Sequence, residues 1–379
     1  MGLLLSQRKK NKTHGGFIIL GVLERIIKTL EKEVKKDIGR PYFRSGDYKI
    51  YDFNKAYFKP LRDVEPRLMA FVDGGNNTIL EAPRFSLQVN RVYFNLFKGR
   101  ERRKPSSRIP EKIEFLSYFN VHELEDAPIG KVKIFPLSEE HAKYLPREED
   151  LTFTLPGPPD FYQRSRMFSV ARRFAEWSFS TSIIEEELDD GDILVRDGSL
   201  KASFEGENKY LHKVMETAHK KGVNLAGLSK TSTLPTTTGN SLIASIKKFA
   251  KDNKYDRWCH PIVDKGADGK ELPGLRILVV KLHKLTEYIF RLDLLKGDDD
   301  EVEVISAIGE NAIDPTFPGY PYGLIDADLN ARVRMDEVQL YKTRILSGLS
   351  EDILEDLKAH IRAVDAHEKL NMIANISKN

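Results

Sequence analysis

The segment RLMAFVDGG, residues 67–75, is the strongest indication of fold class in this sequence. A continuous apolar run that leads into an acid and two glycines is typical of a buried strand followed by a turn. The segment GDILVRDGSL, residues 191–200, repeats this arrangement, with a helical pattern before it and another after it. Strands that alternate with helices predict a mixed α/β sheet with right-handed crossovers. We therefore expect Asp73 and Asp197 at the ends of two strands of one sheet.

The remaining patterns predict a helical arm followed by one elaborated domain. Apolar residues at helical spacing between residues 17 and 37 predict an amphipathic helix, whose stripe consists of Leu20, Leu23, Ile27, Leu30 and Val34. The segment RFSLQVNRVYFNLF, residues 84–97, predicts one or two long strands. We expect an arm and linker over residues 1–60, the main domain over 61–345, and a C-terminal helix over 346–379 that packs on the same domain.

Composition restricts the compartment and the partners. The chain has 379 residues, a formal net charge of +3 and one cysteine, Cys259. Attraction to nucleic acid must therefore come from local basic patches. One cysteine excludes an intrachain disulfide and a multi-cysteine zinc site, and this indicates a reducing compartment. The apolar runs near the N-terminus are shorter than the roughly 20 residues that span a bilayer. We expect a cytoplasmic protein without a membrane partner.

Three acids stand out by their context. Asp73 and Asp197 each follow an apolar strand, and Glu176 lies within a predicted helix that leads toward the second strand. Asp-Gly is also a common turn dipeptide, so each copy taken alone is explained by a turn. The alternative is that the carboxylates meet beyond the strand ends, where open α/β sheets bind ligands. Clustered carboxylates repel one another unless a divalent cation compensates, so this alternative implies Mn²⁺ or Mg²⁺. Two such ions would support metal-dependent hydrolysis of a phosphodiester.

A basic stretch, KGRERRKPSSRIPEK, occupies residues 98–112. It reads as a solvated loop, or as a mobile loop that contacts phosphates of DNA or an acidic partner without reading bases. Its candidate contact residues are Arg100, Arg102, Arg103, Lys104 and Arg108.

Five motifs occur in a specific order: FVDGGN, RRFAEW, LVRDGSL, LSKTS and GYPYGLIDADLNAR. This ordered set, over residues 70 to 335 or so, resembles the NurA family of prokaryotic DNA-end-processing nucleases. The resemblance implies a ribonuclease-H-like fold flanked by helices and DNA hydrolysis that depends on Mn²⁺ or Mg²⁺. It also implies a homodimer that forms a channel for DNA, and partnership with the hexameric HerA translocase.

The resemblance assigns roles residue by residue. Asp73 and Asp197 correspond to strand-borne metal ligands, and Glu176 corresponds to a helix-borne ligand. Lys230 would contact a phosphate or the developing charge, and Tyr320 takes the family's aromatic position. Where the family commonly has histidine, this chain has Asp328, which can bind a metal but cannot act as a cationic proton donor.

Asp326 is the competing residue in the last motif. Residues two apart point about 200° apart on a helix, so only one of the two aspartates can face the metals. The register from Tyr320 favours Asp328.

These expectations describe a nuclease that acts on DNA ends in double-strand break repair or in defence, as a 5′–3′ exonuclease, a single-strand endonuclease or both. One alternative is a DNA clamp or adaptor for the translocase whose catalytic site has decayed at Asp328. Another is an actin-like or sugar-kinase-like ATPase, since these enzymes use Asp-Gly turns on phosphates. The sequence has no convincing adenosine pocket to favour this last alternative.

Overall fold

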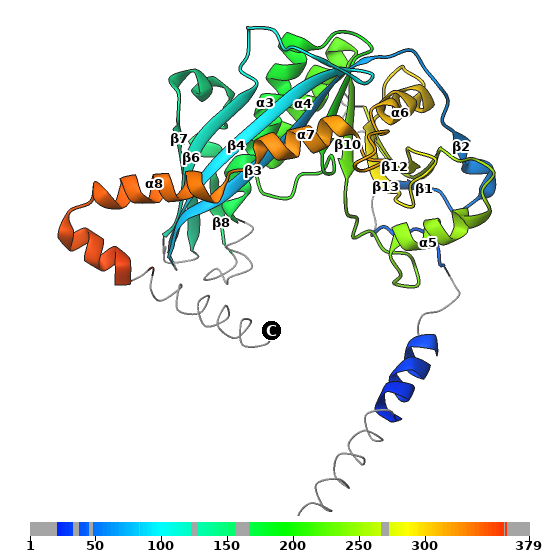
Figure 1. Cartoon of the computed structure of the whole chain (residues 1–379), viewed down its shortest axis with the longest axis horizontal. Helices are drawn as coiled ribbons and strands as arrows, with labels where there is room; N and C mark the ends of the chain where they lie inside the picture. Colours follow the sequence, from blue (N-terminus) through cyan, green and yellow to red (C-terminus); the bar gives the residue numbers. More distant parts are fainter. Residues whose placement is uncertain are drawn as a thin grey trace, which may run out of the picture.

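The computed structural model describes residues 21–32, 38–44, 48–82, 84–122, 128–155, 167–266, 273–359 and 361. Within these residues, thirteen strands form one long mixed sheet, and helices pack on both of its faces (Figure 1). This architecture confirms the predicted mixed α/β fold class. No helix in the described part of the chain is both long enough and apolar enough to cross a bilayer.

The strands are β1 (Tyr48–Ile50), β2 (Lys59–Pro60), β3 (Leu68–Ala82), β4 (Phe85–Lys98), β5 (Glu101–Arg103), β6 (Lys112–His122), β7 (Ile129–Pro136), β8 (Thr152–Thr154), β9 (Ile193–Asp197), β10 (Asn224–Ser229), β11 (Trp258–Lys265), β12 (Leu275–Lys281) and β13 (Phe290–Leu295). The α-helices with these labels are α3 (Val170–Glu187), α4 (Glu207–Lys221), α5 (Leu242–Phe249), α6 (Glu301–Glu310), α7 (Tyr322–Ala331) and α8 (Met335–Ser347). Short 3₁₀ helices occupy Lys55–Tyr57, Glu139–Tyr144, Glu148–Asp150 and Ala250–Asp252.

The strand order places β9 between β3 and β10. β9 runs parallel to both neighbours, whereas the other pairings of the described sheet are antiparallel. The last β3–β9 pair joins Val72 to Arg196, so Asp73 and Asp197 follow at the same position along the sheet. The carboxyl ends of parallel strands meet at one edge, and the fold therefore brings the two aspartates together.

The centre of the sheet is buried on both faces. In β3, Ala70 and Val72 belong to the core that contains α3 and α4, while Met69 and Phe71 belong to the opposite core with α6 and α7. Successive side chains of a strand point to opposite faces. Because both faces are covered, the apolar run of β3 is continuous, as expected from the sequence.

The two glycines after Asp73 do not form a turn, contrary to our expectation. β3 continues through them to Ala82 and stays paired with β4, with Asp73 opposite Tyr93. A side chain on Gly74 would collide with Glu176 of α3, and one on Gly75 would collide with the backbone at Ala331. The glycines therefore let two helices approach the strand closely. Gly198 differs, because its φ of 104° lies in the left-handed region that favours glycine, and the chain bends there directly after Asp197.

The segment predicted to form one or two strands is a single strand, β4, over Phe85–Lys98. The basic stretch that follows is only partly a loop. Its residues Glu101–Arg103 form β5 and pair with the end of β4.

The two ends of the chain are helical where they are described. Residues 21–32 form a helix on which Leu23, Ile27 and Leu30 are 49% to 55% exposed, while Leu20 and Val34 lie outside the described residues. Residues 351–359 form another helix, and Leu357 packs against a small cluster that includes Val338 of α8. Residues 362–379 of the predicted C-terminal helix lie outside the described residues. The proposed division into arm, domain and terminal helix stays a prediction.

Candidate metal centre

Three carboxylates meet at the edge of the sheet where β3 and β9 stop pairing. Asp73, Asp197 and Asp328 each offer an oxygen, and these ligand atoms all lie within 4.8 Å of one another. Two of the acids come from adjacent strands and the third comes from α7. This helix lies across β3 and β4, where Gly323 packs on Phe71 because any larger residue would overlap its ring.

Lys230 and Tyr320 contact the same carboxylates. The Lys230 Nζ lies 2.8 Å from Asp197 Oδ2 and 3.4 Å from Asp328 Oδ1. The Tyr320 hydroxyl donates to Asp197 Oδ1 at 3.1 Å. Lys230 also lies 5.6 Å above the ring of Tyr320. The structure thus places five of the six predicted site residues around one point.

The proton affinity of Asp73 reflects this crowding. Burial, followed by the charges of Asp197 and Glu176, raises the pKa of Asp73 to about 8. A hydrogen bond from the Gly74 backbone N–H at 2.7 Å and the Lys230 charge act in the opposite direction. Ionisation of Asp73 is therefore disfavoured in the absence of a cation. The neighbouring positive charge does not balance the three carboxylates. Their oxygens are hard donors that fit a divalent ion such as Mn²⁺ or Mg²⁺.

Two further pKa shifts fix the protonation of the neighbours. Burial alone would lower the pKa of Lys230, but its hydrogen bond with Asp197 outweighs this effect, so the ammonium stays charged. Burial and then the Asp197 charge raise the pKa of Tyr320 far above its ordinary value. Tyr320 therefore keeps its proton and remains a hydrogen-bond donor.

Glu176 is beside the three aspartates but not among them. Glu176 is buried, with 1% of its surface exposed. Its two carboxylate oxygens form ion pairs with Arg172 and Arg196. The Arg196 guanidinium also lies 4.1 Å from the centre of the Trp177 ring. The structure thus differs from the expected convergence of Glu176 with Asp73 and Asp197, because both Glu176 carboxylate oxygens are paired with arginines.

Sequence reasoning missed both arginines. Arg172 donates to the Gly74 carbonyl at 2.9 Å and to Asn76 Oδ1 at 3.0 Å, so it links α3 to the strand that carries Asp73. One signal was available, because Arg172 and Glu176 are four residues apart on a predicted helix. Nothing local in the sequence indicated Arg196, because its partner lies 20 residues away.

The structure separates the two aspartates of the last motif. Asp328 joins the cluster and also pairs with Arg332 one turn along the helix. Asp326 points elsewhere, accepting from Asn95 at 2.8 Å and from Arg102 at 3.1 Å. This is the arrangement expected from the 200° separation of the two positions.

The basic stretch is largely engaged with acids of the same chain. The pairs are Arg100 with Glu310, Arg102 with Asp326, Arg103 with Glu101, and Arg108 with Glu186. Lys104 alone of the five has no ion pair or hydrogen bond within the described ranges. The stretch is therefore better tethered than either a solvated loop or a mobile loop, although all four pairs involve half-exposed or exposed arginines.

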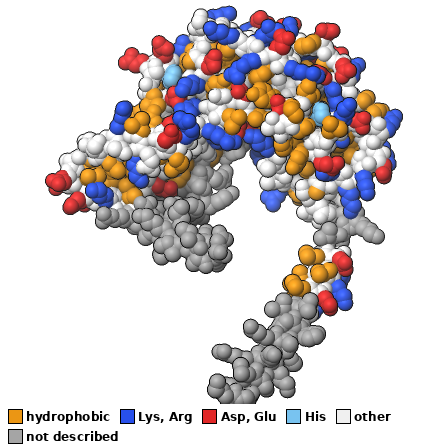
Figure 2. Space-filling model, viewed as in Figure 1, with side chains coloured by type: hydrophobic (Ala, Val, Ile, Leu, Met, Phe, Trp, Pro, Cys, Tyr) orange, Lys and Arg blue, Asp and Glu red, His pale blue; other side chains and the backbone are white. Residues whose placement is uncertain are grey.

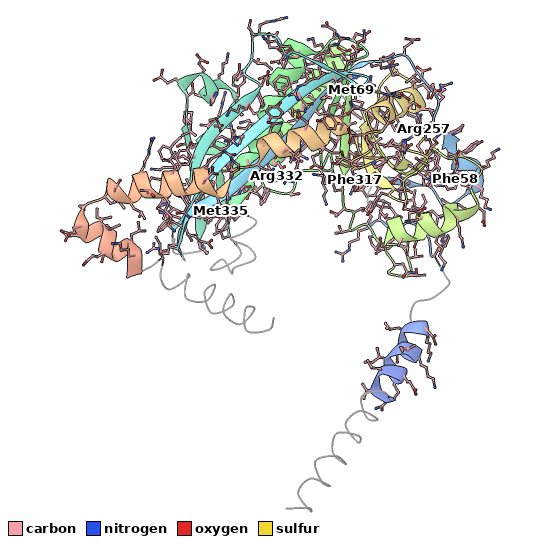
Figure 3. The ribbon with its side chains drawn as sticks, in the orientation of Figure 1. Phe58, Met69, Arg257, Phe317, Arg332 and Met335 are labelled. Carbon is pink, nitrogen blue, oxygen red and sulfur yellow. The ribbon has the colours of Figure 1, made fainter. Side chains whose placement is uncertain are left out.

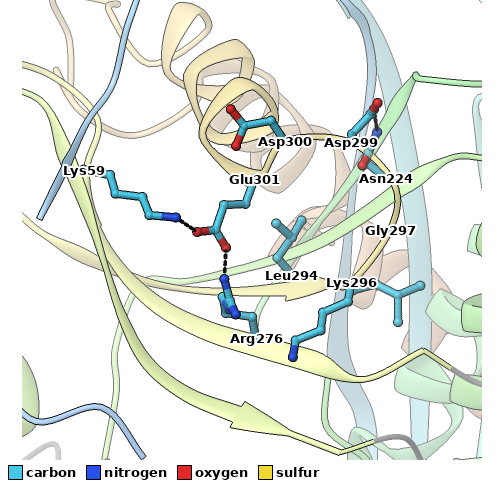
Figure 4. A pocket seen from close by; sticks show the side chains of 10 residues that line it. Lys59, Asn224, Arg276, Leu294, Lys296, Gly297, Asp299, Asp300 and Glu301 are labelled. Carbon is cyan, nitrogen blue, oxygen red and sulfur yellow. Dashed lines mark hydrogen bonds and ion pairs between the residues drawn. The ribbon is translucent and has the colours of Figure 1, made fainter. Parts of the chain in front are cut away.

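A separate pocket of about 350 Å³ lies at the opposite end of β10, beside Asn224 (Figure 4). Its charges satisfy one another, because Glu301 accepts from both Lys59 and Arg276 at 2.6 Å. Asn224 likewise donates to Asp299 at 2.7 Å. The pocket is a closed ion-pair network, and it provides no uncompensated charge for a ligand.

Comparison with known proteins places the chain in a family. The NurA domain matches residues 67–333, which include every member of the cluster. The NurA nuclease from Sulfolobus solfataricus is similar in structure, with a TM-score of 0.51 and 12% identity over 90% of this chain and 98% of that one. Argonaute from A. aeolicus also matches, with a TM-score of 0.30, 10% identity, and coverage of 74% of this chain and 29% of that one, which is too weak to bear on function. No protein with a curated description matches. Because the domain match covers well over half of the sequence, this chain belongs to the NurA family.

Proposed function

We propose that this chain is a metal-dependent deoxyribonuclease that processes DNA ends, as a 5′–3′ exonuclease, a single-strand endonuclease or both. The observation that carries the proposal is the convergence of three carboxylates within 4.8 Å, next to a charged lysine, in a member of a nuclease family. Divalent ions held there would supply activation of water and stabilisation of the leaving oxygen.

We assign a separate role to each residue of the cluster. Asp73, Asp197 and Asp328 would hold Mn²⁺ or Mg²⁺, and two ions would explain the need for three carboxylates. Tyr320 fixes the orientation of Asp197 through its hydroxyl. Lys230 is 44% exposed, so its ammonium can reach a phosphate of bound DNA without leaving the cluster.

Glu176 differs from the three aspartates because it is already paired with two arginines. Its pairs with Arg172 and Arg196 must weaken before it can become a metal ligand, and a second bound ion would favour this exchange by attracting the carboxylate. In the absence of such an exchange, Glu176 serves to anchor the two arginines beside Asp73.

We further propose that the protein works as a homodimer with a HerA-type hexameric translocase, in double-strand break repair or in defence. Family membership supports this proposal. The exposed stripe on residues 21–32 supports it too, because an apolar helix face is costly to leave in water. A translocase would supply DNA movement, for which the sequence of this chain has no motor motif.

The test is an assay on end-labelled single-stranded and double-stranded DNA with Mn²⁺, Mg²⁺ or EDTA, with and without the translocase. We expect cleavage with a divalent ion, none with EDTA, and none for Asp73→Asn. Asp63→Asn is a matched control, since the Asp63 side chain is almost fully exposed and is not one of the three clustered carboxylates. DNA binding without cleavage under every metal would instead establish the clamp or adaptor.

A further inference from the structure

Two aromatic rings form a stack at the surface beside the metal centre. The rings of Tyr288 and Phe317 have centroids 5.1 Å apart and planes 30° apart. Tyr288 is 58% exposed, and Leu285 on the same turn is 77% exposed. Phe317 lies near the concave lower edge of the molecule (Figure 3). We call Tyr288 and Phe317 the aromatic ridge.

The ridge is continuous with the metal centre. Phe317 lies 6.2 Å from Tyr320 by ring centroids, at an angle of 75°. Tyr320 in turn donates to Asp197 and lies under Lys230. Tyr320 is buried, so it joins the carboxylate cluster to Phe317 from below, and Phe317 and Tyr288 continue this series of rings to the surface.

The ridge is held rigidly by the two loops that carry it. The Tyr288 backbone N–H donates to Thr286 Oγ1 at 3.0 Å, and Thr286 is buried. A side chain on Gly319 would collide with Thr286, so the two loops pack directly against each other. The Gly319 backbone N–H also donates to the Ala312 carbonyl at 2.7 Å. The rings are therefore preorganised, which reduces the entropic cost of stacking a ligand on them.

Lysines lie on one side of the turn that carries Tyr288. Thr286 and Glu287 line a pocket of about 650 Å³, together with Lys247, Lys248, Lys251 and Lys281. Two acids, Asp256 and Glu287, also line this pocket, and Glu287 pairs with Lys247 at 3.2 Å, so basic side chains outnumber acidic ones by four to two. On the side of the metal centre, Lys230 adds a further positive charge. Lys and Arg side chains are also common along the concave lower edge of the molecule (Figure 2).

We propose that the aromatic ridge stacks the bases of single-stranded DNA that enters or leaves the metal centre, while the neighbouring lysines contact its phosphates. The inference rests on the proposed nuclease function and names the form of the substrate. Stacking on aromatic rings accepts every base, because every base has a π face, and it suits an enzyme that acts without reading sequence. A protein partner fits less well, because the rings lead directly into the carboxylate cluster.

The test measures binding of the full-length protein to fluorescent dT20 and to an abasic oligonucleotide of equal length, in EDTA so that neither is cleaved. We expect Tyr288→Ala to weaken dT20 binding about tenfold, which is about 1.4 kcal/mol and within the range for stacking one base. Binding of the abasic strand should not change, since it keeps the phosphates but has no bases. Tyr288→Phe should bind dT20 like the wild type.

The controls separate the possible failures. Tyr42→Ala removes a tyrosine that is 46% exposed and has no ring contact within the described residues, so it should leave dT20 binding unchanged. Hydrolysis of bis(p-nitrophenyl) phosphate with Mn²⁺, a substrate without bases, should be equal in wild type and Tyr288→Ala. If wild type cleaves DNA but Tyr288→Ala binds dT20 normally, the ridge is not a stacking site. If no metal supports cleavage while Tyr288→Ala loses only dT20 binding, the nuclease proposal fails and the stacking site stands.

Two other outcomes would also overturn the inference. Equal losses with dT20 and with the abasic strand would mean that the substitution disturbs the fold or the electrostatics. A change in oligomeric state by light scattering, with DNA binding intact, would assign the ridge to a protein contact.

Discussion

Replacing Asp73 with asparagine should stabilise the metal-free protein, and the gain should grow with pH. Burial, followed by the charges of Asp197 and Glu176, penalises the ionised carboxylate and raises the pKa of Asp73 from its ordinary value of 3.8 to about 8 in the folded state. The unfolded chain ionises Asp73 freely. A group whose pKa is raised by folding contributes stability below the unfolded pKa, and this stability is lost as pH rises toward the folded pKa.

The magnitude follows from the two pKa values. Between about pH 4 and pH 8, each pH unit costs the wild type up to about 1.4 kcal/mol of unfolding free energy. The advantage of Asp73→Asn should therefore grow by up to about 3 kcal/mol between pH 5 and pH 7. Asparagine has nearly the same shape, and its Oδ1 can still accept the hydrogen bond from the Gly74 backbone N–H. The substitution thus removes the charge with little loss of packing.

The assay is urea denaturation in EDTA at pH 5, 6 and 7, repeated at pH 7 with Mn²⁺. A ligand present at 100 times its dissociation constant stabilises the folded state by about 2.7 kcal/mol. Saturating Mn²⁺ should raise the free energy of unfolding of the wild type by a similar amount and should raise that of Asp73→Asn much less. The same variant should lose DNA cleavage.

Asp264→Asn is a control of opposite sign. Burial would raise the pKa of Asp264, but hydrogen bonds from Arg276, Lys296 and Tyr51 outweigh it and lower the pKa. Asp264→Asn should therefore destabilise the protein more at pH 7 than at pH 3. The reasoning is refuted if Asp73→Asn destabilises the metal-free protein by the same amount at pH 5 and pH 7.

Three further predictions address other parts of the chain. Asp328→Ala should lower both Mn²⁺ affinity and turnover, with partial rescue by excess Mn²⁺; if Asp328→His instead raises activity above wild type, the aspartate is a decayed position. Arg102→Ala should lower the free energy of unfolding by about 1–2 kcal/mol, because it leaves Asp326 without its charged partner, and it should not alter the salt dependence of DNA binding. If Arg102→Ala instead flattens the salt dependence of DNA binding and leaves the free energy of unfolding unchanged, Arg102 contacts DNA. Deletion of residues 1–36 should abolish dimer formation or association with a HerA-type translocase, measured by light scattering and co-purification; retention of both would remove the arm from these contacts.

Much of the sheet could be predicted from local patterns. The continuous apolar run of β3 indicated a strand buried on both faces, and alternate residues do enter two different cores. The same run pointed to Asp73, and its counterpart in β9 pointed to Asp197. Burial and periodicity report which face a residue occupies, and this is information that a short window of sequence contains.

Partners across the chain could not be predicted in this way. The sequence favours a turn at Asp73-Gly74-Gly75, yet β4 pairs with this segment and keeps it extended, and the glycines instead make room for two helices. Tertiary pairing overrides local propensity here, because hydrogen bonds to β4 satisfy the backbone that a turn would otherwise use.

The partners of charged side chains could not be predicted from local sequence either. Arg102 was expected to contact phosphates, but it pairs with Asp326, which lies 224 residues away along the chain. Glu176 was expected to face the metals, but Arg196 of the neighbouring strand takes one of its oxygens. A side chain's charge is fixed by its residue type, whereas the identity of its partner depends on which elements the sheet topology brings within about 4 Å. Residue types and spacing therefore indicated four candidate acids, and the register from Tyr320 favoured Asp328 over Asp326. Only the packing of α3 and β9 beside β3 pairs Glu176 with two arginines and sets it apart from the three aspartates.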